Sequence, residues 1–368
     1  MLHQFYHILL FITISLLSIP TAHCRWFLLP GVSYSNEFGI VGTLVFISEN
    51  DQRDRFEVRL EYYGEEEGQV GGRVFIPRET VEWTFEGRYQ IAEQKLYSPY
   101  FKSYHEALGV DIRYWTEALV SLDFPQGDGF FWGVQTGYRA IYIKDDFQDD
   151  PDLLNNTEYD VVYTQGYLTK VGLRSGFERR NNRYNSTAGY YLLAQTDGGI
   201  YRAWDEIRPM VQSTLDFRVY HAIGSYNTLV AFNAKGGATQ DDVPYFCEFH
   251  IGGSASLRGV PVDRYSGSRY YVMRAELRQM LLNDIPSPFR IFKSLYPDFA
   301  DDTYSAGFVL FTDMGDAWRS GEGWWGVRQN IGAGLRLALP PDVVGSIDIA
   351  TPLDSDHVEF YLTLGQSF

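Results

Sequence analysis

Residues 81–89 read VEWTFEGRY, a stretch in which apolar and charged side chains alternate. Because successive side chains of an extended strand point to opposite faces, one face would carry Val81, Trp83, Phe85 and Tyr89. The other face would carry the charged and polar residues between them. This two-residue period predicts a β-strand with one apolar face and one polar face.

The same period returns further along the chain, at 212–219 (QSTLDFRV), 330–339 (NIGAGLRLAL) and 358–368 (VEFYLTLGQSF). Aromatic residues make up 16% of the sequence, glycine occurs 35 times, and charged residues are only 21%. This composition favours strands joined by tight turns. The sequence contains no internal repeat and no interdomain linker, so we expect one strand-rich domain.

Strand length separates a membrane barrel from a soluble sandwich, whose strands alternate as well but usually run about five or six residues. A strand that crosses the hydrocarbon at a tilt needs about 9–11 residues. Such lengths are possible at 107–124, 130–143, 158–174 and 268–281. In lipid every backbone polar group must be paired within the protein, so a spanning sheet has to close on itself. The pattern therefore predicts an all-β, transmembrane antiparallel β-barrel.

The expected number of strands is sixteen, since an even number returns the carboxyl terminus to the side on which the barrel began. In this division the first strand covers 31–47 and the eleventh covers 244–251. The acidic connectors 64–67 (GEEE) and 145–152 (DDFQDDPD) are interpreted as solvated turns.

The chain begins with an apolar run, 8–20 (ILLFITISLLSIP), followed by small residues. That order is typical of a signal peptide, which we assign to residues 1–24, and the barrel domain then covers 25–368. No later segment reaches the run of about 18 apolar residues that a membrane helix needs. With Cys24 at the cut, the mature chain keeps only Cys247, so we expect no internal disulfide.

Charge and residue spacing exclude several classes of function. A net charge of −16 argues against nucleic acid as a partner, because phosphate binding needs a basic surface. The histidines expected in the mature chain stand in no spacing that specifies a metal site or a nucleophile with its base: His105, His221, His250 and His357. We therefore expect no enzymatic activity, no metal and no cofactor, and outer-membrane lipid as the surrounding partner.

Four short motifs follow one another in the last third of the chain. They are 252–260 (GGSASLRGV), 275–278 (AELR), 311–315 (FTDMG) and 330–337 (NIGAGLRL). Their order resembles the BamA/TamA outer-membrane assembly factor superfamily, of the bacterial surface antigen type. The last residues, 364–368 (LGQSF), resemble the family's ending and the barrel-assembly signal of outer-membrane proteins.

The resemblance implies that the loop between strands eleven and twelve folds back into the lumen, where its arginine, Arg258, pairs with acidic groups on the wall. The alternation agrees, because Asp313 shares a face with Phe311, and Glu276 shares a face with Arg278. An arginine can meet a carboxylate with two parallel hydrogen bonds. The alternative is that Arg258 only fills and solidifies the barrel.

Three groups of residues are expected to carry the site. The loop motif comprises Gly252, Gly253, Leu257, Arg258 and Gly259. The inward partners are Asp313, Glu276, Phe311 and Arg278. The barrel-assembly signal comprises Phe360, Leu362, Leu364 and Phe368.

The function that the resemblance implies is insertion or translocation of proteins at the outer membrane of a Gram-negative bacterium, with client proteins and a separate periplasmic partner. Family members carry periplasmic POTRA domains before the barrel, whereas here only residues 25–30 separate the expected signal from the expected first strand. Val260 stands where the family prefers an aromatic residue. The alternatives are a passive pore or structural barrel with a loop-plugged lumen, and an outer-membrane hydrolase.

Overall fold

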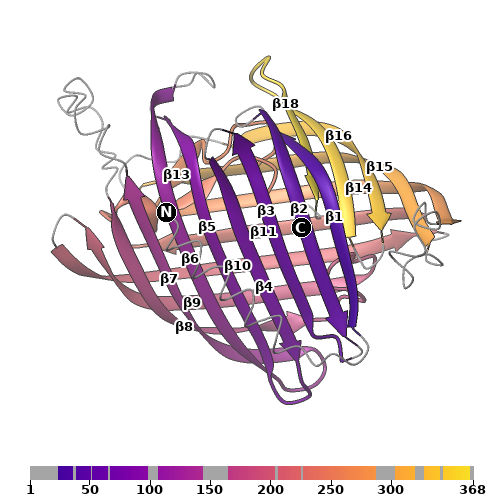
Figure 1. Ribbon diagram of the computed structural model, residues 1–368, viewed down its shortest axis with the longest axis horizontal. Coiled ribbons are helices and arrows are strands. Elements are labelled where there is room, and N and C mark those ends of the chain that lie inside the picture. Colours follow the sequence, from indigo (N-terminus) through magenta and orange to yellow (C-terminus); the bar gives the residue numbers. More distant parts are fainter. Residues whose placement is uncertain are drawn as a thin grey trace.

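The computed structural model describes residues 24–35, 39–50, 52–64, 67–97, 107–143, 165–203, 206–224, 227–286, 303–319, 327–339 and 343–364. Most of them lie in antiparallel strands that wrap into a barrel (Figure 1). The described ranges contain no helix long and apolar enough to cross a membrane.

Within these ranges sixteen strands build the barrel wall. In chain order they are β1 (Cys24–Ser35), β2 (Gly39–Asn50), β3 (Arg55–Gly64), β4 (Glu67–Pro77), β5 (Glu82–Tyr97), β6 (Ala107–Pro125), β7 (Phe130–Ile143), β8 (Gly166–Glu178), β9 (Gly189–Ala203), β10 (Glu206–Ile223), β11 (Thr228–Thr239), β14 (Arg269–Pro286), β15 (Thr303–Trp318), β16 (Arg328–Leu339), β17 (Val343–Pro352) and β18 (Glu359–Leu364). Each strand pairs with the next along the chain, and β18 pairs with β1 to close the ring. The predicted antiparallel barrel is confirmed.

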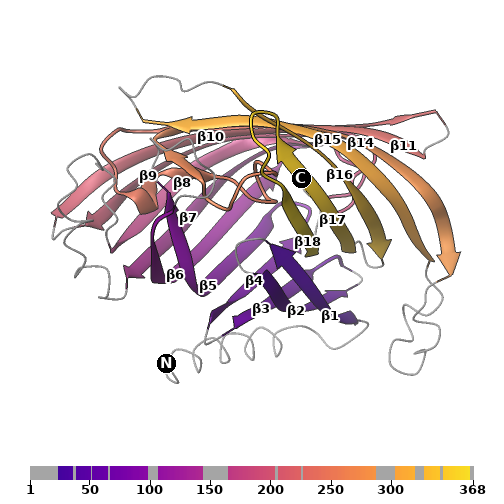
Figure 2. The same ribbon diagram turned by 90° about the horizontal axis from the view of Figure 1, so that it is seen from above.

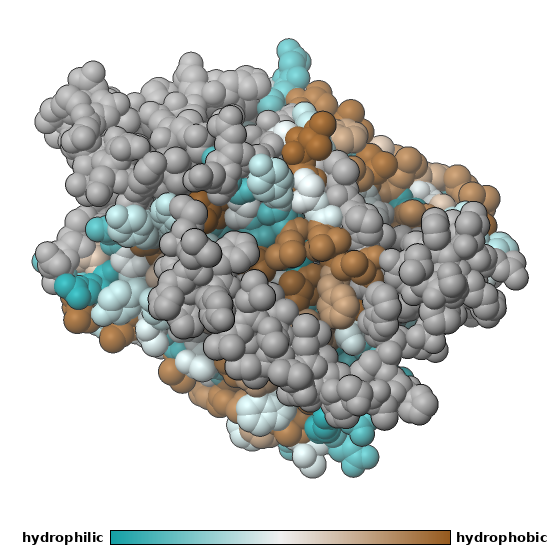
Figure 3. Space-filling view, in the orientation of Figure 1, coloured by the Kyte–Doolittle hydropathy of each residue, from teal (hydrophilic) through white to brown (hydrophobic). Residues whose placement is uncertain are grey.

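Alternating side chains give the wall two different faces. In β18 the Phe360 side chain is 38% exposed on the outside, whereas Tyr361 is only 3% exposed on the lumen side. Large apolar side chains exposed on the outer face include Trp83, Val171, Leu173, Ile200, Leu215, Leu277, Leu310, Ile331, Leu335 and Ile349. Figure 3 shows such hydrophobic residues gathered on the side where Figure 1 labels β14, β15 and β16. An apolar exterior around a polar interior is the arrangement of a lipid-embedded barrel.

The segment between β11 and β14, residues 240–268, is here called the lumen loop. It contains a 3₁₀ turn, η2 (Tyr245–Cys247), and a short hairpin of β12 (Phe249–Ile251) and β13 (Tyr265–Gly267). Figure 2 shows this loop, coloured orange, inside the ring of strands. The eleventh and twelfth strands of the barrel wall flank it.

Two of the expected strands are wrong, and their errors cancel in the count. The expected first strand, 31–47, is two strands, because Gly39 adopts a φ of 68° and starts β2 there. The expected eleventh strand, 244–251, is not part of the wall. Its apolar residues are buried inside the barrel, where Phe246 is 0% and Cys247 1% exposed. Periodicity alone cannot distinguish an apolar face that meets lipid from one that packs in the lumen.

The expected start of the first strand, at residue 31, is also wrong, because residues 25–30 belong to β1, where Pro30 pairs with Leu44 of β2. The expected signal peptide, 1–24, lies outside the described residues apart from Cys24, which begins β1. Phe368 lies outside them as well.

Candidate functional site

Arg258, at the tip of the lumen loop, is the centre of the site. Its Nε and Nη2 each donate to one oxygen of Asp313 in β15, both at 2.8 Å, so the two groups form a parallel, two-bond pair. Its Nη1 donates to Glu276 in β14 at 2.7 Å and to Asp348 in β17 at 3.3 Å. We call these four residues the arginine cluster. Three strands of one wall thus hold a single guanidinium.

The arginine cluster is shielded from solvent. Arg258 and Asp313 are 0% exposed, and Glu276 is 2% exposed. The guanidinium carbon lies 3.4 Å from the centre of the Phe311 ring, so the ring covers the planar face that the hydrogen bonds leave open. Burial alone would lower the pKa of Arg258, but the neighbouring carboxylates, Asp313 foremost, outweigh burial and hold that pKa above its ordinary value. The arginine therefore remains charged.

Three further arginines balance the carboxylates and tie the loop to the wall. Arg278 donates to Glu276 at 2.7 Å, and Arg336 of β16 donates to both oxygens of Asp348, at 2.5 and 3.1 Å. Arg274 donates to the backbone oxygens of Ser254 and Ala255 in the lumen loop, at 3.1 and 3.0 Å. Buried charges are tolerated when each is paired and hydrogen-bonded, as they are in this network.

Backbone contacts hold the loop tip to the two remaining strands of that wall. Asn330 of β16 donates to the Arg258 backbone oxygen. The Tyr361 hydroxyl of β18 accepts from the Gly259 N–H and donates to the Val260 carbonyl, both at 3.1 Å. The tip therefore contacts five consecutive strands, β14 to β18.

Glycines make room for this arrangement in both the loop and the wall. Gly252, Gly253 and Gly259 have φ values of 137°, 75° and 96°, a region that disfavours side chains. In β16 a Cβ at Gly332 would collide with the Phe311 ring, and a Cβ at Gly334 would collide with the Asp348 carboxylate. The Gly-x-Gly-x-Arg pattern of β16 is thus explained by the bulk of its neighbours.

The other arm of the lumen loop is anchored to the opposite wall. Phe246 and Cys247 pack in an apolar cluster with Leu168 of β8, Tyr201 of β9 and Met210 of β10. Beside them, the backbone oxygen of Phe246 accepts a hydrogen bond of 2.9 Å from the Arg139 side chain in β7. Glu248 is tied instead to the wall of the arginine cluster, through a bond of 2.9 Å from Arg319, which follows β15. The loop consequently spans the lumen from one wall to the other.

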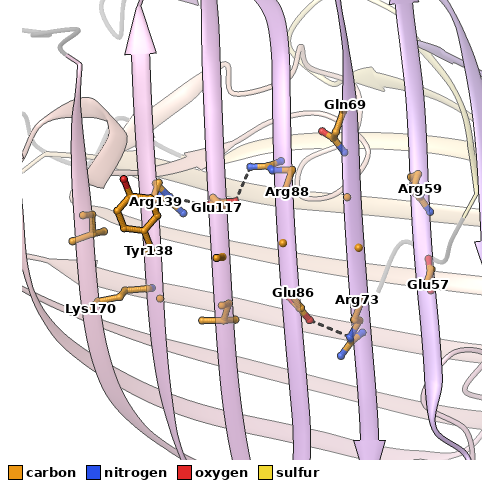
Figure 4. Close-up of a pocket in the computed structure, with 17 residues that line it drawn as sticks. Glu57, Arg59, Gln69, Arg73, Glu86, Arg88, Glu117, Tyr138, Arg139 and Lys170 are labelled. Atoms are coloured by element: carbon orange, nitrogen blue, oxygen red, sulfur yellow. Dashed lines mark hydrogen bonds and ion pairs between the residues drawn. The ribbon is translucent and has the colours of Figure 1, made fainter. Parts of the chain in front are cut away.

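A cavity of about 490 Å³ remains in the lumen beside β3 to β8, and we call it the lumen cavity. Charged side chains from successive strands line it: Glu57, Arg59, Arg73, Glu86, Arg88, Glu117, Arg139 and Lys170. Figure 4 shows Arg88 and Arg139 on either side of Glu117, which accepts hydrogen bonds from them at 2.9 and 2.5 Å. These charged side chains suit water or a polar chain segment.

The structure brings most of the expected residues together. Arg258, Asp313, Glu276, Phe311 and Arg278 form one contact network, and Leu257 is fully buried beside them. Phe360 and Leu362 lie in β18, outside this network, and Phe360 packs against the Tyr34 ring of β1 at 5.5 Å. Leu364 ends β18.

Sequence reasoning missed several partners of the loop, among them Asp348 and Tyr361. Both face the lumen, as do Ser346 and Glu359, which stand two positions earlier in the same strands. That alternation marks them as inward but gives no sign of which loop they meet. Their pairing depends on strand register, which local sequence does not specify.

Comparison with known proteins identifies a matching family and two similar structures. A model of the Omp85 superfamily domain matches residues 79–279. BamA from Haemophilus ducreyi lacking POTRA domains 1–3 is 15% identical, with a TM-score of 0.57 over 93% of this chain and 70% of that chain. CdiB from Escherichia coli is 12% identical, with a TM-score of 0.57 over 94% and 68%. At these identities the two structures show a shared barrel fold. No curated protein matches the chain in sequence.

Proposed function

The chain belongs to the Omp85 superfamily, and from that membership we propose that it inserts or translocates proteins at the outer membrane of a Gram-negative bacterium. In this proposal residues 1–24 are an export signal and residues 25–368 are the barrel domain. Its partners are membrane lipid, client proteins and a periplasmic protein that delivers them.

The observation that carries the proposal is the link between the lumen loop and the barrel seam. Tyr361 holds the loop tip and lies in β18, the strand that closes the barrel against β1. Among the described residues the β1–β18 register is defined at Tyr34 and Leu362. Movement of the loop would pull directly on β18. An opened seam would offer unpaired backbone groups, to which an incoming strand of a client can add.

A specific observation favours a second candidate, a barrel with a permanent plug. The arginine cluster is fully paired and almost fully buried, and breaking such a pair costs about 3–5 kcal/mol. A loop held this firmly would close the lumen for the life of the protein. The two candidates differ in whether the seam ever meets a client.

Site-specific photocrosslinking in growing cells separates them. A photoreactive residue replaces Tyr34 or Leu362 at the seam, and a control replaces Leu215, which is 50% exposed on β10 across the barrel. The proposal predicts that newly made outer-membrane or secreted proteins are captured at the two seam positions and are released as their assembly finishes. Capture equal to that of the Leu215 control would contradict it.

A further inference from the structure

The connection between β8 and β9, residues 179–188, is long for the end of the barrel on which it lies. Strands alternate in direction, so this end is the one where β1 begins and β18 stops, and we call it the terminal end. The turns beside it, 126–129 and 224–227, are four residues each. A ten-residue connection there needs a physical reason, since turns at one end of such barrels are typically short.

Loop 179–188 has a fixed shape of its own. The Asn181 side-chain oxygen accepts from the backbone N–H groups of Thr187 and Ala188, at 3.0 and 3.1 Å. The Asn182 oxygen accepts from the N–H groups of Tyr184 and Asn185, at 2.7 and 3.0 Å. A backbone hydrogen bond of 3.0 Å from the Asn181 N–H to the Ala188 carbonyl closes the base of the loop, and the side-chain bonds satisfy backbone groups beyond it.

One side of the loop is fixed next to its own strands. Arg180 donates to both oxygens of Glu178, at 2.8 and 2.5 Å, and its guanidinium stacks 4.7 Å from the Tyr191 ring of β9. The side chain of Arg180 is 8% exposed. This half of the loop is therefore a stable base.

The other side reaches across the barrel mouth to strands that are not its neighbours. Arg183 donates to both oxygens of Glu82 in β5, at 2.9 and 2.8 Å, and lies 4.7 Å from the Phe75 ring of β4. Next to it, the Arg55 guanidinium of β3 lies 3.8 Å from the Tyr184 ring. Because β6 and β7 separate β5 from β8, the loop bridges the inside of the mouth.

We propose that loop 179–188 is a second closure, which seals the terminal end of the lumen and is held shut by the Arg183–Glu82 pair. The lumen cavity lies beside β3 to β8, on the same side of the barrel as this loop. At its other end the cavity borders Arg139 and Leu168, which hold Phe246 of the lumen loop. The lumen cavity thus lies between the two loops.

The two closures differ in strength, which sets the order of opening. The side chains of Arg183 and Glu82 are 35% and 19% exposed, whereas those of Arg258 and Asp313 are both 0% exposed. Breaking a partly solvated ion pair costs much less free energy than breaking a buried one, which leaves a buried charge without a partner. The terminal closure therefore opens first and without release of the arginine cluster. The same order of opening is expected whether the protein is a transporter or a plugged pore.

Reagent access to the lumen cavity tests the proposal. The full chain carries Leu119→Cys, a cavity-lining position on β6, with Cys24→Ser and Cys247→Ala, and is held in lipid nanodiscs. The rate of labelling by a membrane-impermeant thiol reagent is measured for the parent, Arg183→Ala, Glu82→Gln and the charge swap Arg183→Glu with Glu82→Arg. Arg208→Ala is the matched control. Arg208 pairs with Glu206, and their side chains are 53% and 58% exposed.

Both single changes should raise the labelling rate by about tenfold, because the open population grows when the pair is lost. The charge swap should return it to within about twofold of the parent, and Arg208→Ala should leave it unchanged. Equal rates in all variants would overturn the proposal. Single variants that fail to give a heat-modifiable folded barrel, beside a swap that folds, would make the pair an assembly element and would overturn it as well.

Discussion

The Tyr361 hydroxyl and the backbone of Gly259 are joined by a hydrogen bond of 3.1 Å, although the two residues are 102 positions apart in the chain. The same hydroxyl donates to the carbonyl of Val260, so one side chain satisfies two groups of the loop tip. Because Tyr361 belongs to the last strand, the loop that fills the lumen and the seam of the barrel are mechanically one unit.

Tyr361→Phe removes both bonds and keeps the ring. We expect a loss of about 1–3 kcal/mol in the free energy of unfolding, because a buried N–H and a buried carbonyl lose their partner. Urea unfolding followed by heat-modifiable mobility measures it. Tyr62→Phe, on a side chain 62% exposed on β3, is the control and should change little. An equal effect of the two changes would refute the link.

Arg258→Lys keeps the charge but loses the flat, forked shape. A lysine cannot make the two parallel bonds to Asp313 or lie against the Phe311 ring, so we expect a loss of about 1–3 kcal/mol in unfolding free energy. Arg258→Ala, which also leaves carboxylates buried and uncompensated, should lose about 3–5 kcal/mol. Full stability of the lysine variant would show that charge alone holds the loop.

Gly332→Ala tests the close contact between β15 and β16. The new methyl would meet the Phe311 ring that covers Arg258 and also the backbone oxygen of Ile349, so we expect a loss of about 1–3 kcal/mol in stability. Combining it with Phe311→Leu should cost less than the sum of the two single changes, since the smaller residue removes the contact with the ring. Gly345→Ala on β17 is the matched control, because its nearest neighbours would lie at 3.9 Å. Strict additivity would contradict the steric account.

The buried thiol of Cys247 should make stability fall in alkali. Burial raises the pKa of this thiol to about 12, above the value of about 8.5 for an exposed cysteine. The contribution to stability is therefore complete below the unfolded-state pKa and is lost as pH rises toward the folded-state pKa. Between pH 8.5 and pH 10 the free energy of unfolding should fall by about 2 kcal/mol more than in Cys247→Ala. Parallel pH profiles for the two proteins would disprove it.

The wall of the barrel is predictable from sequence because its physical cause is local. Alternation places Glu276 and Asp313 on the lumen face regardless of what they contact, and the structure buries both. The prediction that Arg258 pairs with Asp313 depends on the family resemblance together with that alternation. Alternation alone does not distinguish Asp313 from other acidic residues that face the lumen.

What sequence could not provide is the identity of the surface that buries an apolar residue, and the register between distant strands. Phe246 reads as a strand residue, yet it packs inside the barrel against Leu168 and Tyr201. The partners of Tyr361 and Asp348 depend on the register between neighbouring strands. The partner of Arg183 depends on where loop 179–188 crosses the barrel mouth. Each depends on the closed ring as a whole.

The most direct test of the account is the conductance of single molecules in planar bilayers, wild type against Arg258→Ala. Because the arginine cluster keeps the lumen loop across the channel, the wild-type protein should show small or rare openings, and Arg258→Ala should show large, frequent ones. Arg208→Ala should behave as wild type. A large, stable conductance in the wild type that Arg258→Ala leaves unchanged would contradict the central claim.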